Sequence, residues 1–391
     1  MKSKNKIYLF EQKFANYLGM KHAYSFWKGR VALSAILYAL GVKKNDEILL
    51  PGYTCVVVPN SIIFQKAKPV YVDINPYNLG IDPKKIEKKI TSKTKVIIIQ
   101  HTLGIPAQIE QIIEIAKKHN LKIIEDSAQC LGSLYKNQKT SHFSDAAFFS
   151  TQWSKPFTTG IGGIAVTNDE KINKKLIEFQ KKCLRPGFFE IIKLFVENVA
   201  YTQCLKPQYY WGFMALYRFL TKINIVTGSS KPRELFNKKP YDYEKIMSGM
   251  QAKIGLKKLK NIDIINEHRQ KISKIYIKGL KHFQSLWFEQ NKHIYLLRFP
   301  LLVQNKKEVL LEAKKHKIEI GDWFLSPIHP NQKNLEKVGY SWGDCPVAEK
   351  ICKHIINLPT HSMVNEKMAN KIINFIQKVA KPYYINNNLN I

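Results

Sequence analysis

Short apolar segments alternate with helical patterns between residues 47 and 167, and no other feature restricts the fold of this chain more strongly. The apolar segments span residues 47–50, 69–73, 95–100, 122–125, 146–149 and 164–167. Helical patterns lie between several of them, for example at residues 83–90 and 108–119. Strands that are hydrophobic along their length and joined by helices are typical of a parallel sheet with helices on both faces. The sequence therefore predicts an α/β fold.

Polar residues and a glycine stand where three of the predicted strands end. They are His101 and Gly104, Asp126 and Gln129, and Ser150 and Lys155. Ligands of parallel α/β sheets bind at the carboxyl ends of the strands. Because the three ends belong to different strands, the fold can bring these side chains together in one site.

Lys155 is the only charged residue in the segment FFSTQWSKPFTTGIGG, which spans residues 148–163. Partial desolvation lowers the pKa of a lysine and leaves more of it as the nucleophilic free amine. Such amines form Schiff bases with carbonyl compounds, above all with pyridoxal phosphate. The alternative is an ordinary surface lysine. The other polar residues at the strand ends favour the reactive amine.

Two further positions suit the same cofactor. Asp126 closes its strand, where a carboxylate can pair with a protonated pyridine nitrogen, although aspartate also caps helices well. Gly29 and Arg30 precede a helical run at residues 31–37. A glycine there leaves backbone N–H groups that bind a phosphate, and Arg30 adds charged donors; the alternative is a plain helix start.

The formal net charge of +32 admits a nucleic-acid partner, an anionic membrane surface or an anionic substrate. Because the lysines are dispersed along the whole chain, a diffuse surface field or compositional drift is favoured over a binding arm.

The six cysteines form no CxxC pair and no His/Cys cluster has zinc spacing, so no metal site is predicted. The start MKSKNKIYLFEQKF lacks the apolar core of a signal peptide, and no uncharged apolar run reaches membrane-spanning length. We expect a reduced, cytoplasmic protein.

The length of 391 residues favours two domains. We expect a large domain at residues 1–240 and a smaller α/β domain at residues 241–391. In the smaller domain the pattern predicts helices at residues 250–280, 306–316 and 366–380 and a β-like run at residues 295–303. The stretch 187–230, rich in aromatic and aliphatic residues with scattered basic ones, interrupts the large domain. Its mixture is typical of amphipathic helices that pack on the protein, in a subunit interface or on a membrane surface.

Several motifs, taken in order, resemble one family. They are FEQKFANYLG, KGRVAL, DEILLPGYTCVV, TKVIIIQHTLGIP, KIIEDSAQCLGSLY, FFSTQWSKPFTTGIGG, MSGMQAKIGLKKL, SPIHP and DCPVAEKICKHIINLP. From Phe10 to about residue 378 the chain resembles the DegT/DnrJ/EryC1/StrS aminotransferases, pyridoxal-phosphate enzymes that aminate keto sugars. The resemblance implies the type I aminotransferase fold, in which a large domain with a mostly parallel central sheet flanked by helices carries a smaller C-terminal α/β domain.

The resemblance also implies roles for single residues. Lys155 matches the Schiff-base lysine, and Asp126 matches the partner of the pyridine nitrogen. Gln129 matches the residue beside the phenolic oxygen of the cofactor. Ser150 matches a phosphate-binding serine, and His329 matches a histidine of a late Pro-x-His motif near the substrate. Gly29 and Arg30 occupy the family's Gly-Thr phosphate turn.

The chain departs from the family pattern at three places. Arg30 replaces a threonine. Cys55 stands where an aromatic ring stacks on the cofactor, so that Tyr53 or another residue is expected to take its place. The family's Asn-x-Arg, which reaches the site of the neighbouring subunit, reads Glu244 and Ile246 here. We expect Arg30 to compensate for that lost cation.

As a member of this family the chain is expected to transfer an amino group, with glutamate as donor, to a keto sugar. The acceptor is expected to be nucleotide-linked and to serve a cell-surface polysaccharide or related glycan, and the protein is expected to be a homodimer. One alternative keeps the chemistry but places the acceptor on a lipid or at the inner membrane face, with peripheral membrane contact. Another is a non-catalytic basic binding module; a nucleic-acid partner is not expected.

Overall fold

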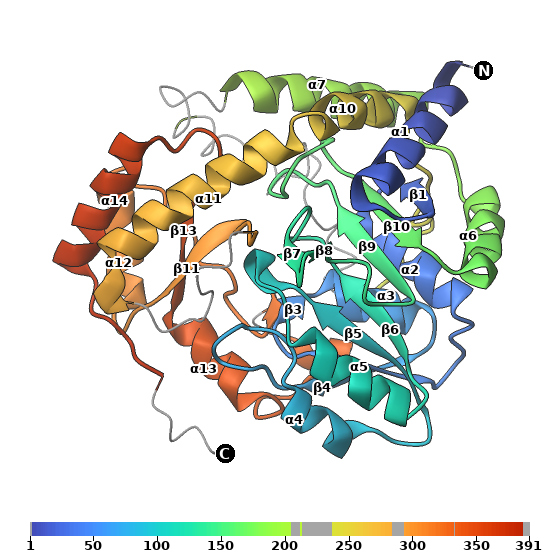
Figure 1. The fold of residues 1–391 in the computed structure, drawn as a ribbon, viewed down its shortest axis with the longest axis horizontal. Helices are drawn as coiled ribbons and strands as arrows, with labels where there is room; N and C mark the ends of the chain where they lie inside the picture. The colour runs from blue at the N-terminus through green and yellow to red at the C-terminus, as the bar shows by residue number, and fades with distance from the viewer. Residues whose placement is uncertain (1, 205–211, 213–236, 284–292, 332, 386–391) are drawn as a thin grey trace.

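The computed structural model describes residues 2–204, 212, 237–283, 293–331 and 333–385. A seven-stranded sheet forms its centre (Figure 1) in the order β1-β10-β9-β6-β5-β2-β4. The strands are β1 (His22–Phe26), β2 (Glu47–Pro51), β4 (Lys68–Val72), β5 (Thr94–Gln100), β6 (Lys122–Asp126), β9 (Ala146–Ser150) and β10 (Gly163–Thr167). All six predicted strands are present, and their ends differ from the predicted ends by no more than one residue. The α/β fold predicted from the apolar segments is confirmed.

The sheet is parallel through β4, β2, β5, β6 and β9, and it becomes antiparallel at β10. A loop, and not a crossover helix, joins β9 to β10. Because the chain makes no crossover here, β10 runs antiparallel to β9. Lys155 lies in this loop. The edge strand β1, which pairs antiparallel with β10, was not predicted.

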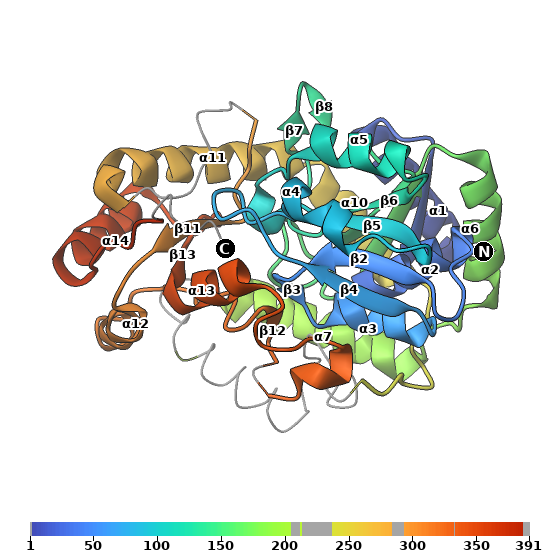
Figure 2. The same ribbon diagram turned by 90° about the horizontal axis from the view of Figure 1, so that it is seen from below.

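Helices cover both faces of the sheet (Figures 1 and 2). On one face lie α2 (Gly29–Ala39), α3 (Val57–Phe64) and α6 (Glu170–Lys182). On the other lie α1 (Lys2–Leu18), α4 (Pro83–Ile86), α5 (Ile109–Lys118) and α10 (Gly249–Leu259). The neighbours Ile123 and Ile124 of β6 belong to different clusters, one on each face, because side chains alternate along a strand. This two-sided burial explains why the strands are apolar throughout.

A second hydrophobic cluster lies beside the sheet, at the left of Figure 1. It is built from α11 (Ile262–Gly279), α12 (Lys306–Lys315), α14 (Glu366–Val379), β11 (Arg298–Leu302) and β13 (Ile355–Pro359). The predicted helix 250–280 is in fact two helices, α10 and α11, with Asn261 between them. The remaining elements are β3 (Thr54–Cys55), β7 (Leu134–Tyr135), β8 (Gln138–Lys139), β12 (Ile328–His329), α13 (Pro346–His354) and four short 3₁₀ turns. The domain boundary at residues 240/241 stays a prediction.

The apolar stretch at residues 187–230 begins with the helix α7 (Phe188–Cys204). Residues 205–211 and 213–230 of that stretch lie outside the described residues, as does the tail from residue 386. On its inner side α7 buries Leu194 against Trp27, Trp153 and Ile161. Among the residues that the structure describes, none of the helices has the length and apolar character needed to cross a membrane.

Candidate functional site

A hollow of about 660 Å³, part of it open to solvent, lies where the carboxyl ends of β5, β6 and β9 meet the start of α2. Of the eight residues that the family resemblance assigns to the site, seven line the hollow. They are Gly29, Arg30, Cys55, Asp126, Gln129, Ser150 and Lys155. The structure thus brings together side chains that are as far apart in sequence as residues 29 and 155. Their individual roles stay predictions.

The start of α2 forms one wall of the hollow through an unusually close packing of glycines. A Cβ atom on Gly163 would lie 2.4 Å from the Cα atom of Gly29, so only glycine lets β10 pass beneath this helix end. Gly163 is paired with Ser150 in the sheet, which places the serine beside the same helix end. The side chain of the N-cap residue, Lys28, makes no capping hydrogen bond to the helix. Helix N-termini of this kind, with Arg30 and a hydroxyl beside them, bind anions well.

Asp126 and Lys155 influence each other's protonation across the hollow. Burial raises the pKa of Asp126, while the hydrogen bond from the Ala128 N–H (3.0 Å) and the charge of Lys155 act in the opposite direction. Burial lowers the pKa of Lys155, while Asp126 opposes this shift. The desolvated lysine predicted from the sequence is therefore present. A protonated ring nitrogen beside Asp126 would supply the positive charge that favours its carboxylate form.

The loop between β9 and β10 is held tightly around Lys155. The hydroxyl groups of Thr151 and Thr159 are hydrogen bonded at 2.7 Å, and the Thr159 N–H donates to the carbonyl of Thr151. Trp153 is buried and packs against the tilted ring of Tyr201 of α7, with 4.7 Å between ring centroids. These contacts fix the backbone on both sides of the lysine, so the amine approaches a ligand from a defined direction.

His329 does not line the hollow, but it lies next to Cys55, which does. The short strand β12 pairs with β3 and places His329 opposite Cys55. Burial lowers the pKa of His329 to about 4, Asp322 opposes the shift, and Lys155 adds to it. The Nδ1 atom accepts a hydrogen bond from the Leu325 N–H (3.3 Å), so the neutral ring carries its proton on Nε2. His329 is therefore neutral at pH 7.

Tyr53 does not take the place of the missing stacking ring at Cys55. Its side chain is fully buried, its ring lies 4.8 Å from that of Phe324, and it is not part of the wall of the hollow. Gln129 is held by the Leu103 N–H, which donates to its Oε1 atom at 3.0 Å.

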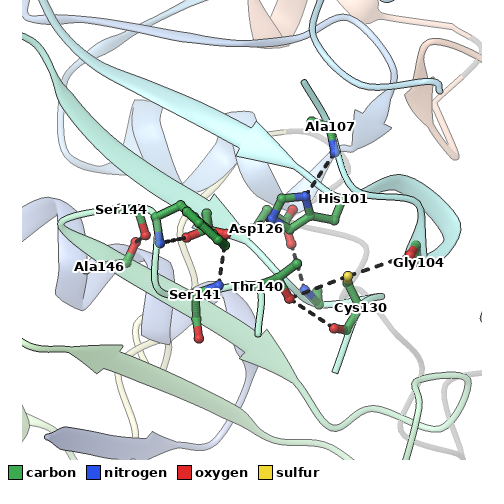
Figure 3. A network of polar contacts seen from close by, with 12 residues as sticks. His101, Gly104, Ala107, Asp126, Cys130, Thr140, Ser141, Ser144 and Ala146 are labelled. Carbon is green, nitrogen blue, oxygen red and sulfur yellow. Dashed lines mark hydrogen bonds and ion pairs between the residues drawn. The ribbon is translucent and has the colours of Figure 1, made fainter. Parts of the chain in front are cut away.

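His101 stands at a strand end as predicted, but it does not line the hollow and belongs instead to a network of polar contacts (Figure 3). Its Nε2 atom lies 2.8 Å from an Oε2 atom of Glu125, and both side chains are fully buried. Its Nδ1 atom accepts the Ala107 N–H (3.3 Å), so Nε2 must donate to the carboxylate. Glu125 also accepts the N–H groups of Ser141 (2.9 Å) and Phe143 (3.1 Å). Burial raises the pKa of Glu125, but the hydrogen bond from His101 and the backbone donors outweigh it, so the pKa is lowered overall.

Replacing Glu125 with glutamine is expected to lower the free energy of unfolding by about 3 kcal/mol, because it leaves buried donors without a charged acceptor. Chemical denaturation at pH 7 measures this. The folded-state pKa of Glu125 lies below its unfolded value of 4.5, so its contribution is complete above pH 4.5 and is lost as the pH falls further. The difference between wild type and variant should therefore shrink below pH 4.5.

A matched control is the pair of the partly buried His22 and the exposed Glu170, whose Nε2 and Oε1 atoms also lie 2.8 Å apart. Glu170→Gln is expected to leave the unfolding midpoint almost unchanged, since water screens an exposed carboxylate. Equal effects at both sites would show that burial of the Glu125 network does not stabilise the fold.

The residues of the hollow fit pyridoxal phosphate. Asp126 suits the ring nitrogen, and Gln129 suits the phenolic oxygen. The helix start with Arg30 and Ser150 suits the phosphate, and Lys155 suits the aldehyde carbon.

Sequence reasoning missed more than half of the wall of the hollow. The missed residues are Lys28, Val57, Val58, Gln100, Ala128, Phe148, Gln152, Ile161 and Gly162. Several of them could have been predicted from the sequence, because they lie within three residues of a predicted site residue. Gln100 ends a predicted strand, and it is fixed by the Thr54 hydroxyl, which donates to its Oε1 atom at 2.6 Å.

Comparisons with known proteins show which family the chain resembles. The model of the DegT/DnrJ/EryC1/StrS aminotransferase family matches residues 1–196 and 221–377. An uncharacterized protein of Methanocaldococcus jannaschii is 30% identical over 385 residues, which cover 95% of this chain and 89% of that protein. GDP-perosamine synthase of Escherichia coli O157:H7 is 30% identical over 369 residues, which cover 93% and 87%.

Solved structures show the same fold. An aminotransferase of this family from Brucella abortus superposes with a TM-score of 0.73 at 22% identity, covering 95% of this chain and 90% of that one. NtdA from Bacillus subtilis, solved with bound cofactor PMP, superposes with a TM-score of 0.74 at 22% identity, covering 95% and 76%. On the family match, the chain belongs to the DegT/DnrJ/EryC1/StrS family of pyridoxal-phosphate-dependent aminotransferases.

Proposed function

We propose that this aminotransferase transfers an amino group from glutamate to a nucleotide-linked keto sugar in the synthesis of a cell-surface polysaccharide or related glycan. The observation that carries the proposal is that Lys155, Asp126 and the start of α2 with Arg30 line one hollow. Relatives at 26–30% identity include GDP-perosamine synthases, and another at 27% is a dTDP-3-amino-3,6-dideoxy-alpha-D-galactopyranose transaminase. A non-catalytic binding module does not fit a member of this family.

The residues divide the chemistry between them. The bound cofactor supplies an electron sink, which stabilises negative charge on the reacting carbon. Asp126 would hold the proton on the ring nitrogen of the bound cofactor. The Nζ atom of Lys155, with its pKa lowered by burial, would take the proton from the substrate carbon and would deliver it to the cofactor carbon that receives the amino group. The neutral Nε2–H of His329 is available as a hydrogen-bond donor beside the reacting groups.

The test is to incubate the cofactor-loaded protein with glutamate and with GDP- or dTDP-linked keto sugars, and to follow products by mass spectrometry. We expect 2-oxoglutarate and an amino sugar in equal amounts. Formation of 2-oxoglutarate without an amino sugar from either nucleotide would contradict a nucleotide-linked acceptor.

We also propose that Arg30 replaces the cation that the family draws from its Asn-x-Arg. The cation nearest that position in this chain, Lys245, is buried in ion pairs with Glu190 (2.7 Å) and Asp242 (2.9 Å), so it is already neutralised. Arg30 is buried at the wall of the hollow. Arg30→Thr should weaken pyridoxal phosphate binding about tenfold or more in equilibrium dialysis. Unchanged affinity would disprove this role.

A homodimer, which the family resemblance implies, is part of the same proposal. Light scattering should give twice the chain mass of 45.4 kDa. A monomer that is fully active would contradict a site shared between subunits.

A second candidate keeps this chemistry but places the acceptor at an anionic membrane. The outer face of α7 supports it, because large apolar side chains follow one another there at helical spacing. They are Phe188, Phe189, Ile192, Phe195, Val196 and Val199, all exposed. The inner face of the same helix packs on the loop of Lys155 through Leu194 and Tyr201. An apolar stripe on a chain of net charge +32 suits an anionic lipid surface.

Cosedimentation with vesicles of anionic and of zwitterionic lipid at low salt tests the second candidate. Anionic vesicles should bind wild type, and the double variant Phe189→Glu with Phe195→Glu should bind at least tenfold less. Trp342→Glu, which removes an equally exposed apolar residue elsewhere, is the control. If wild type does not bind anionic vesicles, this candidate is wrong and the acceptor is soluble. The cytoplasmic location stays a prediction of the sequence.

A further inference from the structure

A second cation faces the region of Lys155 from the C-terminal part of the chain. Arg298 opens β11, and its guanidinium carbon lies 4.5 Å from the ring centroid of Trp323. The Nζ atom of Lys155 lies 6.0 Å from the same centroid. The two distances together limit the separation of the guanidinium and the amine to 10.5 Å.

Arg298 is held in place without being neutralised. Its guanidinium makes no ion pair and no hydrogen bond with any residue in the described part of the chain, and it is only partly buried. A Cβ atom on Gly321 would lie 2.8 Å from its Nη1 atom, so the glycine leaves room for the guanidinium. The backbone N–H of Trp323 donates to the Asn357 side chain at 3.0 Å, and the Trp323 ring packs 5.7 Å from the ring of His329, measured between centroids. Stacking on a fixed ring orients the guanidinium plane and leaves its N–H donors available to a ligand.

The neighbourhood carries an excess of positive charge. The charge of Arg298 contributes to the lowered pKa of Lys155 and of His329. The nearby Arg269 differs, because it is buried and donates to Leu297 and Thr360. An arginine that is stacked and unpaired, close to a reactive amine, can bind a carboxylate or a phosphate through charge-assisted hydrogen bonds.

We propose that Arg298, stacked on Trp323, is an anion subsite for the substrate that stands before Lys155. It takes either the carboxylate of the amino donor or the diphosphate of the nucleotide-linked acceptor, which present the same acceptor chemistry to a guanidinium. This rests on the proposed function. A separation of at most 10.5 Å is compatible with a carboxylate two or three bonds from a reacting nitrogen and with the anomeric phosphate of a bound sugar.

The two halves of the reaction are measured separately in Arg298→Gln, with the cofactor spectrum as the check that the cofactor site is intact. If the donor carboxylate binds here, the glutamate concentration for half-maximal conversion should rise about 10- to 100-fold, while that for the keto sugar is unchanged. If the diphosphate binds here, the increase should appear with the keto sugar alone. Arg298→Lys, which keeps the charge but not the planar fork, should give a smaller increase. No change in either half overturns the proposal.

Calorimetric titration of the holoenzyme with succinate and with inorganic pyrophosphate keeps this test independent of turnover. Wild type should bind one of them at least tenfold more tightly than Arg298→Gln. Lys350→Gln is the matched control, because Lys350 also lies over an aromatic ring, 5.9 Å from the centroid of Tyr383. It should bind both like wild type. If wild type binds neither anion, or binds both as weakly as Arg298→Gln, the subsite does not exist. If an anion binds but no amino sugar forms, the proposed acceptor is wrong and the subsite stands.

Discussion

Lys155→Ala is expected to lower the rate of amino transfer by roughly 10⁴-fold or more, since the change removes both the attachment of the cofactor and the group that moves the proton. The fold should survive. Burial lowers the pKa of Lys155, which means that its charged form is disfavoured in the folded state, so alanine relieves that cost. Stopped-flow absorbance with glutamate measures the rate, and thermal unfolding measures the stability.

The control for Lys155 is Lys139, another partly buried lysine whose pKa is lowered by burial. It lies outside the hollow, over the ring of Tyr17 at 3.7 Å from the centroid. Lys139→Ala should reduce stability through lost packing and leave the rate close to wild type. A Lys155→Ala protein that retains a tenth of wild-type activity would show that another amine does the chemistry.

The central sheet was predictable because its signal is local. Strands buried on both faces must be apolar throughout, and six segments satisfied this. The edge strand β1 was missed because HAYSF mixes polar with apolar residues. The strand is held by the buried carboxylate of Glu11, which accepts hydrogen bonds from the N–H and the hydroxyl of Ser25. No pattern in a single sequence reveals this contact.

The candidate site was predictable to the extent that it follows from strand ends. Residues that follow β6 and β9 meet at one edge because parallel strands bring their carboxyl ends together. The same rule placed His101 there wrongly, because its side chain turns to Glu125 on the far face of the sheet. His329 and Arg298 come from the C-terminal part of the chain, where only the tertiary pairing of β12 with β3 and the stacking on Trp323 bring them near Lys155.

The apolar stretch at residues 187–230 shows another feature that the sequence alone could not predict. Its apolar content predicted amphipathic helices, and α7 is one. The pattern could not tell which face would be covered, because the outer residues Phe188 and Phe195 are as apolar as the buried Leu194. The buried face is set by Trp153, which lies only two residues before Lys155 and packs against Leu194 on the inner face of α7.

Asp126→Asn is expected to reduce the turnover number by roughly 10³-fold while leaving the protein folded, because a neutral amide does not hold the proton on the ring nitrogen and the electron sink is weakened. The asparagine oxygen can still accept the Ala128 N–H that Asp126 binds now. Burial raises the pKa of Asp126 above 3.8, so its ionised form costs stability in the folded protein near pH 7 without the cofactor. The variant should therefore unfold at the same temperature as wild type or a higher one.

Loss of activity together with unchanged or increased stability separates a chemical role for Asp126 from a structural one. Asp145→Asn supplies the opposite pattern. Asp145 precedes β9 at the other end of the sheet, accepts the Ile123 N–H (2.8 Å) and pairs with Lys122 (2.7 Å), so its loss should lower stability and spare turnover. If Asp126→Asn loses stability and activity in proportion, as a structural residue would, the carboxylate serves the fold of the strand end and another group must protonate the ring.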